Sequence, residues 1–365
     1  MNADIKTDKI HGGRVFEAAH ILRKHWSEII DFSANINPLG QPEGLKEAVL
    51  AEFDRALHYP EIHSESLVAK ISTLTGLAPE NLMTGAGSTP HLHLLARSLG
   101  ISRPLIIGPA FAEYEGALAR AGLAAEYVLT CEADDWLVTA DTTARLFSRN
   151  PDAIFLAHPA NPTGRLVPED VLAALAEEAH ARHVWLILDE AFIDFTENGI
   201  SLLPLVEKMP RLIVLRSLTK IFALPGLRLA YMAAHSEAIA RFASLAEPWT
   251  LSSPALTAGH FCLDRAATYA ARSAKTTARL RRILVGELAD FGKIFPSESN
   301  YILLKLKPEL NQHTVIGQLF NDGILVRDAS NFEGLAPGYL RLAVRPEKEI
   351  KSLTTSLKKM AAHCN

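Results

Sequence analysis

The sequence has few cysteines, no marked excess of charge of one sign and no long apolar run. Its three cysteines, Cys131, Cys262 and Cys364, form no closely spaced pair. A disulfide scaffold or a zinc centre is therefore not expected, and we predict no metal site. A formal net charge of −4 provides no basic surface for nucleic acid. No stretch reaches the roughly 18 apolar residues that a membrane-crossing helix needs, so no membrane partner is expected.

Two further absences bear on location and organisation. Residues 1–10 lack the apolar core of a secretory signal, and together with the cysteine pattern this predicts a cytoplasmic protein. No internal repeat or low-complexity tract is present. The composition is ordinary, with 48% hydrophobic residues, and 365 residues indicate two domains or one large α/β body with a smaller partner.

Short apolar runs alternate with amphipathic segments through the middle of the chain. This pattern predicts an α/β fold with a mainly parallel central sheet flanked by helices. The expected strands are 104–108, 153–157, 184–188, 212–215 and 229–233, and the expected helices are 42–57, 89–99, 112–121, 168–182 and 201–208.

The pattern changes after about residue 248. A long helix is expected over 266–291, followed by strands at 301–306, 324–326 and 339–344 and a closing helix from 346. We therefore predict three parts: an arm (1–44) that joins the small domain, a large ligand-binding domain (45–247) and a smaller α+β domain (248–365).

A candidate reactive lysine, Lys220, follows the expected strand 212–215 in the motif Ser217-Leu218-Thr219-Lys220. Ligand-binding crevices open at this edge of α/β sheets. A desolvated lysine loses its proton readily and can form a Schiff base with a carbonyl group. Arg228, eight residues later, carries a rigid guanidinium that suits a phosphate dianion. An isolated loop lysine is usually a surface residue, and it is the neighbouring motifs that favour the reactive role.

Asp189 directly follows the expected strand 184–188. A buried carboxylate is costly there unless it has a cationic or hydrogen-bonded partner. A protonated pyridine nitrogen is such a partner, and holding that proton keeps the ring an electron sink. A helix cap and a metal ligand are the alternative roles, but further metal ligands at a suitable spacing are lacking.

Three weaker motifs precede Asp189 in the sequence. The segment Gly85-Ala86-Gly87-Ser88-Thr89 opens an expected helix, where free backbone N–H groups can bind an anion and Ser88 or Thr89 adds a hydroxyl. Phe111 can stack on a flat ring, and Asn161, in Asn161-Pro162-Thr163-Gly164, can offer its amide to a ring oxygen. Each motif alone is more often simple turn chemistry or core packing.

In this order the motifs resemble those of fold-type I pyridoxal-phosphate (PLP) enzymes, the class I and II aminotransferase group, over nearly the whole chain. The resemblance implies that Lys220 bonds to the cofactor, Asp189 pairs with its pyridine nitrogen, Phe111 stacks on its ring and Asn161 contacts its ring oxygen. It also implies a phosphate site made of Gly87, Ser88, Thr89, Ser217 and Arg228.

The resemblance also implies a homodimer with shared active sites. Tyr59, in His58-Tyr59-Pro60, is similar to the tyrosine that reaches the cofactor phosphate from a second subunit. If Tyr59 has that role, each active site needs both chains.

Within the family, the sequence is most similar to the threonine-phosphate decarboxylases of cobalamin biosynthesis, which themselves resemble histidinol-phosphate aminotransferases. Phe192 stands where the aminotransferases usually have a tyrosine, and this favours the decarboxylases. The implied reaction converts L-threonine O-3-phosphate to (R)-1-aminopropan-2-ol O-phosphate. Transamination of the histidinol-phosphate type and a PLP-binding module without turnover are the alternatives. The segments that carry the similarity are 11–13, 31–40, 111–114, 188–195, 215–220 and 339–345.

The same resemblance suggests how a small phosphorylated amino acid is held. Arg341 resembles the arginine that fixes the substrate carboxylate in the aminotransferases. If Arg341 binds phosphate instead, the carboxylate is free to point out of the ring plane, where its bond to Cα can break. Arg345 could equally be a solvated strand-end residue. Phosphothreonine, phosphoserine and histidinol phosphate all stay open as substrates. The further candidates for the substrate phosphate are Arg327, Arg345, His11 and Asn35.

Overall fold

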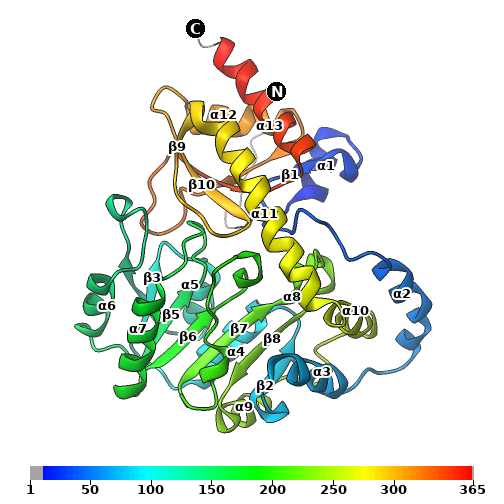
Figure 1. The fold of residues 1–365 in the computed structure, drawn as a ribbon, viewed down its shortest axis with the longest axis vertical. Helices are drawn as coiled ribbons and strands as arrows, with labels where there is room; N and C mark the ends of the chain where they lie inside the picture. Colours follow the sequence, from blue (N-terminus) through cyan, green and yellow to red (C-terminus); the bar gives the residue numbers. More distant parts are fainter. Residues whose placement is uncertain (1–10, 364–365) are drawn as a thin grey trace.

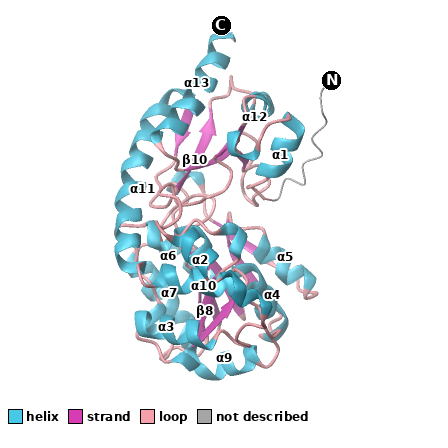
Figure 2. Cartoon of the chain, turned by 90° about the vertical axis from the view of Figure 1, so that its right-hand side faces the viewer, coloured by secondary structure: helices cyan, strands magenta, loops and turns pink. Residues whose placement is uncertain are grey.

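The computed structural model describes residues 11–363, with the side chains of 361–363 left out. A larger body contains the central sheet, and a smaller body lies beside it (Figure 1). Helix α11 (Ala266–Leu288) runs from the larger body along the smaller one, as Figure 2 also shows.

Seven strands form the central sheet in the order β2-β8-β7-β6-β5-β3-β4. Neighbouring strands from β7 to β4 are parallel, whereas β8 runs antiparallel to both β7 and β2. The predicted mainly parallel sheet is therefore confirmed. The strand bounds are β2 Leu82–Gly85, β3 Pro104–Gly108, β4 Glu126–Leu129, β5 Ala153–Ala157, β6 Trp185–Asp189, β7 Leu212–Ser217 and β8 Ala230–Ala234.

Helices cover both faces of this sheet, which explains the continuous apolar runs. Ile187 belongs to the core cluster on one face and its neighbour Leu188 to the cluster on the other, because successive side chains alternate along a strand. The helices of the larger body are α2 Leu45–Ala51, α3 Glu65–Thr75, α4 Ser88–Ser98, α5 Glu113–Arg120, α6 Ala140–Phe147, α7 Glu169–Ala181, α8 Leu218–Ile221, α9 Ser236–Ala243 and α10 Ser253–Leu263.

The smaller body is built on a four-stranded antiparallel sheet in the order β12-β13-β10-β9. Its core cluster includes side chains from α11, α12 and α13. The bounds are β9 Gly292–Ile294, β10 Tyr301–Leu306, α12 Gln312–Asn321, β12 Arg327–Asp328, β13 Tyr339–Ala343 and α13 Glu347–His363.

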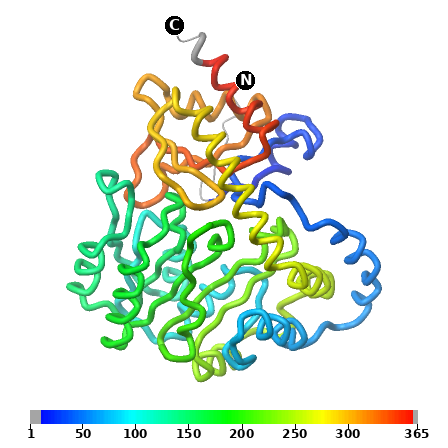
Figure 3. The backbone as a smooth tube through the Cα atoms, in the orientation of Figure 1, coloured from blue at the N-terminus to red at the C-terminus, as the bar shows by residue number. Residues whose placement is uncertain are grey.

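The N-terminal arm packs on the smaller body. After helix α1 (Val15–Leu22), strand β1 (Ile30–Asp31) pairs in parallel with β11 (Ile324–Leu325). Phe32 is fully buried in the core of the smaller body, and its carbonyl accepts a hydrogen bond from the Ala343 N–H. Figure 3 shows the blue start of the described chain beside its orange and red end. The arm therefore brings residues 33–35 to the junction of the two bodies.

The structure differs from the sequence-based expectations in several elements. Residues 201–208 form only the short 3₁₀ helix Leu203–Leu205, with Pro204 in its first turn. The expected helix 42–57 ends at Ala51 and continues as a 3₁₀ segment. Helix α10, in the range expected for the small domain, packs on α2 and α3 and adds Leu256 and Cys262 to the larger body's core. Strands β1, β2, β4, β9 and β12 have no counterpart among the expected strands.

A search of the described residues for a helix long and apolar enough to cross a membrane found no candidate.

Candidate active site

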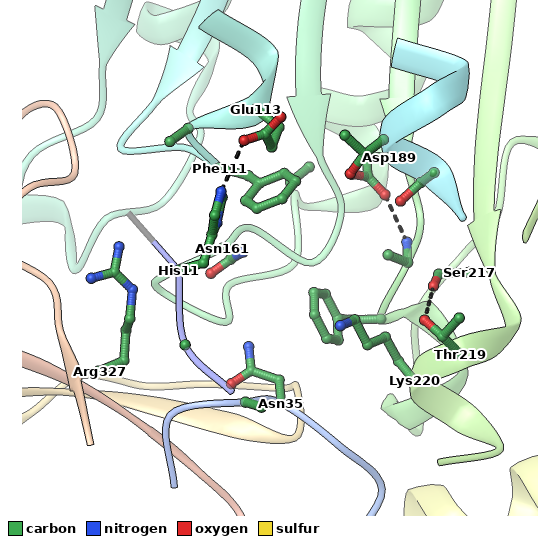
Figure 4. A pocket seen from close by; sticks show the side chains of 18 of the residues that line it. His11, Asn35, Phe111, Glu113, Asn161, Asp189, Ser217, Thr219, Lys220 and Arg327 are labelled. Atoms are coloured by element: carbon green, nitrogen blue, oxygen red, sulfur yellow. Dashed lines mark hydrogen bonds and ion pairs between the residues drawn. The ribbon is translucent and has the colours of Figure 1, made fainter. Parts of the chain in front are cut away.

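A cavity of about 470 Å³ lies where the carboxyl edge of the central sheet meets the arm and the smaller body. Asp189 ends β6 and Ser217 ends β7, and Lys220 lies in helix α8 directly after β7. Parallel strands end at the same edge of a sheet, so the predicted motifs converge there. Figure 4 shows their side chains around the cavity together with His11, Asn35 and Arg327.

Lys220 is the candidate nucleophile. Burial, the nearby charge of Arg341 and that of Arg228 lower the pKa of Lys220 to about 8, against an opposing effect of Asp189. Burial dominates because it penalises the charged ammonium. A much larger share of this amine is therefore neutral near physiological pH than for an ordinary lysine, and a neutral amine can attack a carbonyl carbon.

Asp189 is a buried carboxylate with two hydrogen-bond donors. Its Oδ2 accepts a bond of 2.8 Å from the Tyr114 hydroxyl, and its Oδ1 accepts one of 3.0 Å from the Ala191 N–H. Burial raises the pKa of Asp189, while both hydrogen bonds and the charge of Lys220 lower it. A protonated ring nitrogen would add a cationic partner, as this buried carboxylate requires.

The start of helix α4 is suited to bind an anion at one end of the cavity. Gly87 precedes the helix with φ +93°, a backbone conformation that favours glycine. A Cβ atom at this position would clash with the Arg228 guanidinium, which would have to move. The cavity lining here combines hydroxyls and the guanidinium, from Ser88, Thr89, Ser217, Thr219 and Arg228.

The side chains expected to hold a flat ring lie between these two ends. Phe111 lines the cavity and contacts the ring of Tyr114 edge-on, with centroids 5.8 Å apart. Asn161 accepts a hydrogen bond of 2.7 Å through its Oδ1 from Nη1 of Arg341. Since arginine can only donate, this bond fixes the amide orientation and leaves Nδ2 as the donor for a ring oxygen.

Two arginines form the wall contributed by the smaller body. Arg327 and Arg341 are directly opposite each other on β12 and β13, so their side chains lie on the same face of the sheet. Arg341 also donates through Nη2 to the carbonyl of Ser33, at 2.7 Å. Burial lowers the pKa of both arginines to about 10, and for Arg341 the charge of Arg327 adds to this effect. Both remain charged at neutral pH.

Two buried polar atoms at this wall have no hydrogen-bond partner within the part of the chain that the structure describes. They are Nε of Arg341, a donor, and Oδ1 of Asn35, an acceptor on the arm. Buried polar atoms are usually satisfied, so the pair suggests a ligand carrying both acceptors and donors. His11, also on the arm, contacts Glu113 at 2.9 Å and faces Phe111 at the edge of the cavity.

Three predicted residues do not line the cavity. Gly87 lies directly before Ser88, which does line it. Arg345 donates through its Nε to Glu349, in the first turn of α13, at 2.7 Å. Tyr59 is 83% exposed, contacts the ring of Trp249 and lines a different pocket.

The cavity also contains residues that sequence reasoning did not single out. Tyr114, Thr219, Ser33, Glu113 and Phe332 all line it. Tyr114 could have been found from its position, three residues after Phe111 at the start of a helix, which places both side chains on one face. Phe332, which packs under Arg327 at 5.0 Å, had no such signal in the sequence.

These residues fit pyridoxal phosphate: a neutral amine for its aldehyde, a carboxylate for its pyridine nitrogen, an amide for its ring oxygen and an anion site for its phosphate. The fold and the cavity thus define a PLP-dependent enzyme of fold type I. The chain matches the model of the aminotransferase class I and II family over residues 27–357 and belongs to that family.

Individual relatives point to two reaction types. The chain is 33% identical to the threonine-phosphate decarboxylase of Salmonella typhimurium, covering 95% of each chain. It is 29% identical to the adenosylcobalamin biosynthesis bifunctional protein CobDQ of Leptospira interrogans, covering 94% of this chain and 40% of that one. Among solved structures, the histidinol-phosphate aminotransferase of Clostridium acetobutylicum superposes with a TM-score of 0.84 at 25% identity, covering 92% of this chain and all of the other.

The close approach at Gly87 leads to the first prediction. Gly87→Ala should weaken PLP binding by about tenfold or more, because the new methyl group displaces the Arg228 guanidinium from the phosphate site. Titration of the unloaded protein with PLP, followed by absorbance, measures the affinity. Gly76→Ala is the matched control, since Gly76 has a similar φ of +75° with nothing within 4 Å of the added Cβ. Equal affinities for the two variants would contradict the assigned phosphate site.

Proposed function

We propose that this chain is a PLP-dependent lyase that converts L-threonine O-3-phosphate to (R)-1-aminopropan-2-ol O-phosphate in cobalamin biosynthesis. The observation that carries the proposal is the wall formed by Arg327 and Arg341. The cofactor phosphate already has Arg228, so two further charged arginines at the other end of the cavity suit a substrate with its own phosphate. The similarity to a threonine-phosphate decarboxylase and to a cobalamin biosynthesis protein supports this choice.

The chain's own residues set up the reaction. Bound PLP supplies an electron sink for the bond that breaks at the substrate α-carbon. Asp189 would keep the proton on the pyridine nitrogen, which would maintain that sink. Lys220 would hold the cofactor through its amine. The low pKa of Lys220 would also suit it to transferring a proton at the substrate α-carbon.

The arginine wall also bears on which bond breaks. If Arg327 and Arg341 grip the substrate phosphate, no arginine of that wall clamps the carboxylate in the ring plane, and the carboxylate can stand perpendicular to it. Phe192 lines the cavity beside Tyr301, with ring centroids 5.0 Å apart, where it offers no hydroxyl to the cofactor. The apolar ring of Phe192 would solvate a nearby carboxylate poorly, and this favours loss of the carboxylate as neutral carbon dioxide.

An assay without any 2-oxo acid tests the proposed reaction. Purified protein loaded with PLP should release carbon dioxide from L-threonine O-3-phosphate and form the amino alcohol phosphate. Lys220→Ala should abolish both turnover and the visible absorbance band of the lysine-bound cofactor.

The main alternative is transamination of the histidinol-phosphate type, which the structural similarity to such an aminotransferase supports. Glutamate formation from histidinol phosphate and 2-oxoglutarate, without carbon dioxide release from phosphothreonine, would contradict the decarboxylase. A bound cofactor with neither reaction would instead favour a binding module.

We also propose that the active protein is a homodimer in which Tyr59 contacts the partner's cofactor phosphate. Tyr59 is exposed and contacts the ring of Trp249, and Leu57 lines the same small pocket as Tyr59, so these three exposed side chains form an apolar patch. Contiguous exposed apolar surface of this kind marks an interaction site. The patch suits a second copy of this chain, because Tyr59 would then reach a phosphate site.

Mixing two impaired variants tests the shared site. Tyr59→Ala and Lys220→Ala should each be strongly impaired alone. Random pairing after partial unfolding makes about half of the dimers mixed, and one of the two sites in each mixed dimer is complete. Mixing should therefore restore about a quarter of wild-type activity. The absence of recovery in a mixture that contains mixed dimers would contradict the shared site.

A cytoplasmic location belongs to the same proposal. Cys131 and Cys262, the two cysteines within the described residues, are free thiols. A reducing compartment maintains free thiols. Fractionation of cells that produce the full chain checks the location, and recovery outside the cytoplasmic fraction would contradict it.

A further inference from the structure

Tyr114 occupies an unusual position for a tyrosine, and the proposed reaction gives it no role. It is almost fully buried in the first turn of α5, and its hydroxyl donates to Oδ2 of Asp189 at 2.8 Å. Burial and the neighbouring carboxylate raise the pKa of Tyr114 well above its usual value. The hydroxyl therefore stays protonated and can only act as a donor toward the carboxylate.

We propose that Tyr114 is a positioning residue that acts through Asp189, holding this carboxylate ionised and oriented for the ring nitrogen of the cofactor. The proposal rests on the proposed function for its cofactor, and it goes beyond it by assigning a role to a residue that need not touch the reacting atoms. The hydroxyl is the only side-chain hydrogen-bond donor to Asp189 among the residues that the structure describes.

The environment of Asp189 explains why this donor matters. Burial opposes ionisation of the carboxylate, and three interactions favour it: the Tyr114 hydroxyl, the Ala191 N–H and the charge of Lys220. Tyr301 on β10 is a further titratable group near Asp189.

The geometry leaves room for the ring nitrogen. Each carboxylate oxygen can accept two hydrogen bonds, and Oδ1 and Oδ2 each have one donor from the protein. A carboxylate fixed at both oxygens cannot rotate freely. The ring nitrogen therefore meets an acceptor of defined direction, which is what keeps its proton in place.

The ring of Tyr114 has a separate structural role, which the test must leave intact. It packs edge-on against Phe111 and contacts Phe155 at a centroid distance of 6.1 Å. Tyr114→Phe keeps the ring and removes only the hydroxyl. Tyr269→Phe is the matched control, because Tyr269 is also buried and donates to a backbone carbonyl, that of Gly40, at 2.6 Å, without lining the cavity.

The experiment compares both variants with the wild type in their PLP-loaded forms. Without substrate, the pH at which the visible cofactor band titrates should rise in Tyr114→Phe. If the ring nitrogen holds its proton less firmly, the ring withdraws less electron density from the bond between Lys220 and the cofactor. The Lys220 nitrogen in that bond then keeps its proton to a higher pH. With L-threonine O-3-phosphate, kcat should fall about tenfold, the size expected for losing a hydrogen bond to a charged group, while KM changes less than about twofold. The control should match the wild type in both measurements.

A double-mutant comparison separates this role from a general loss of structure. Adding Tyr114→Phe to Asp189→Asn should change the band titration no further, because the carboxylate through which Tyr114 acts is already gone. An unchanged titration in Tyr114→Phe, or a further shift in the double variant, would overturn the proposal. The substrate-free titration is independent of the reaction, so it tests Tyr114 even if the enzyme acts on another substrate. Absence of carbon dioxide release together with the expected shift would contradict only the proposed function.

Discussion

An excess of positive charge at the junction of the two bodies is the constraint on which the site depends. Lys220, Arg228, Arg327 and Arg341 line one cavity, whereas its carboxylates are Asp189 at the sheet edge and Glu113. Like charges in a poorly solvated cavity repel one another unless anions accompany them. Burial, and after it the charges of Arg341 and Arg228, lowers the pKa of Lys220. The same excess of positive charge suits the cavity to a phosphorylated cofactor and a phosphorylated substrate.

The arm and the smaller body complete a site that the central sheet alone would leave open. Arg341, on β13, donates both to Asn161 of the larger body and to the Ser33 carbonyl of the arm. One guanidinium thus connects three parts of the chain. The bond to Asn161 fixes the orientation of its amide, so a residue proposed to bind the substrate and one proposed to bind the cofactor are held together. A shift of the smaller body relative to the sheet would disturb both.

Sequence reasoning found the residues whose chemistry is tied to their place in a motif. Lys220, Asp189, Asn161 and Phe111 all follow predicted strands, and parallel strands bring their carboxyl ends to one edge, so their convergence was foreseeable. The partners that fix these groups were not foreseeable, since they depend on packing between distant segments. The hydrogen bond from Tyr114 spans 75 positions in the chain and that from Arg341 to Asn161 spans 180. Arg345 shows the converse. Its place in the sequence near Arg341 suggested a site role, but its side chain pairs locally with Glu349, four residues later.

Calorimetry on the PLP-containing Lys220→Ala variant, which cannot turn over, tests whether Arg327 and Arg341 bind the phosphate of the substrate. L-threonine O-3-phosphate should bind about a hundredfold or more tightly than L-threonine, because charge-assisted bonds to phosphate are strong, and Arg327→Met should remove most of this difference. Equal affinities for the two ligands, or an undiminished difference in the Arg327→Met background, would contradict phosphate binding by these two arginines.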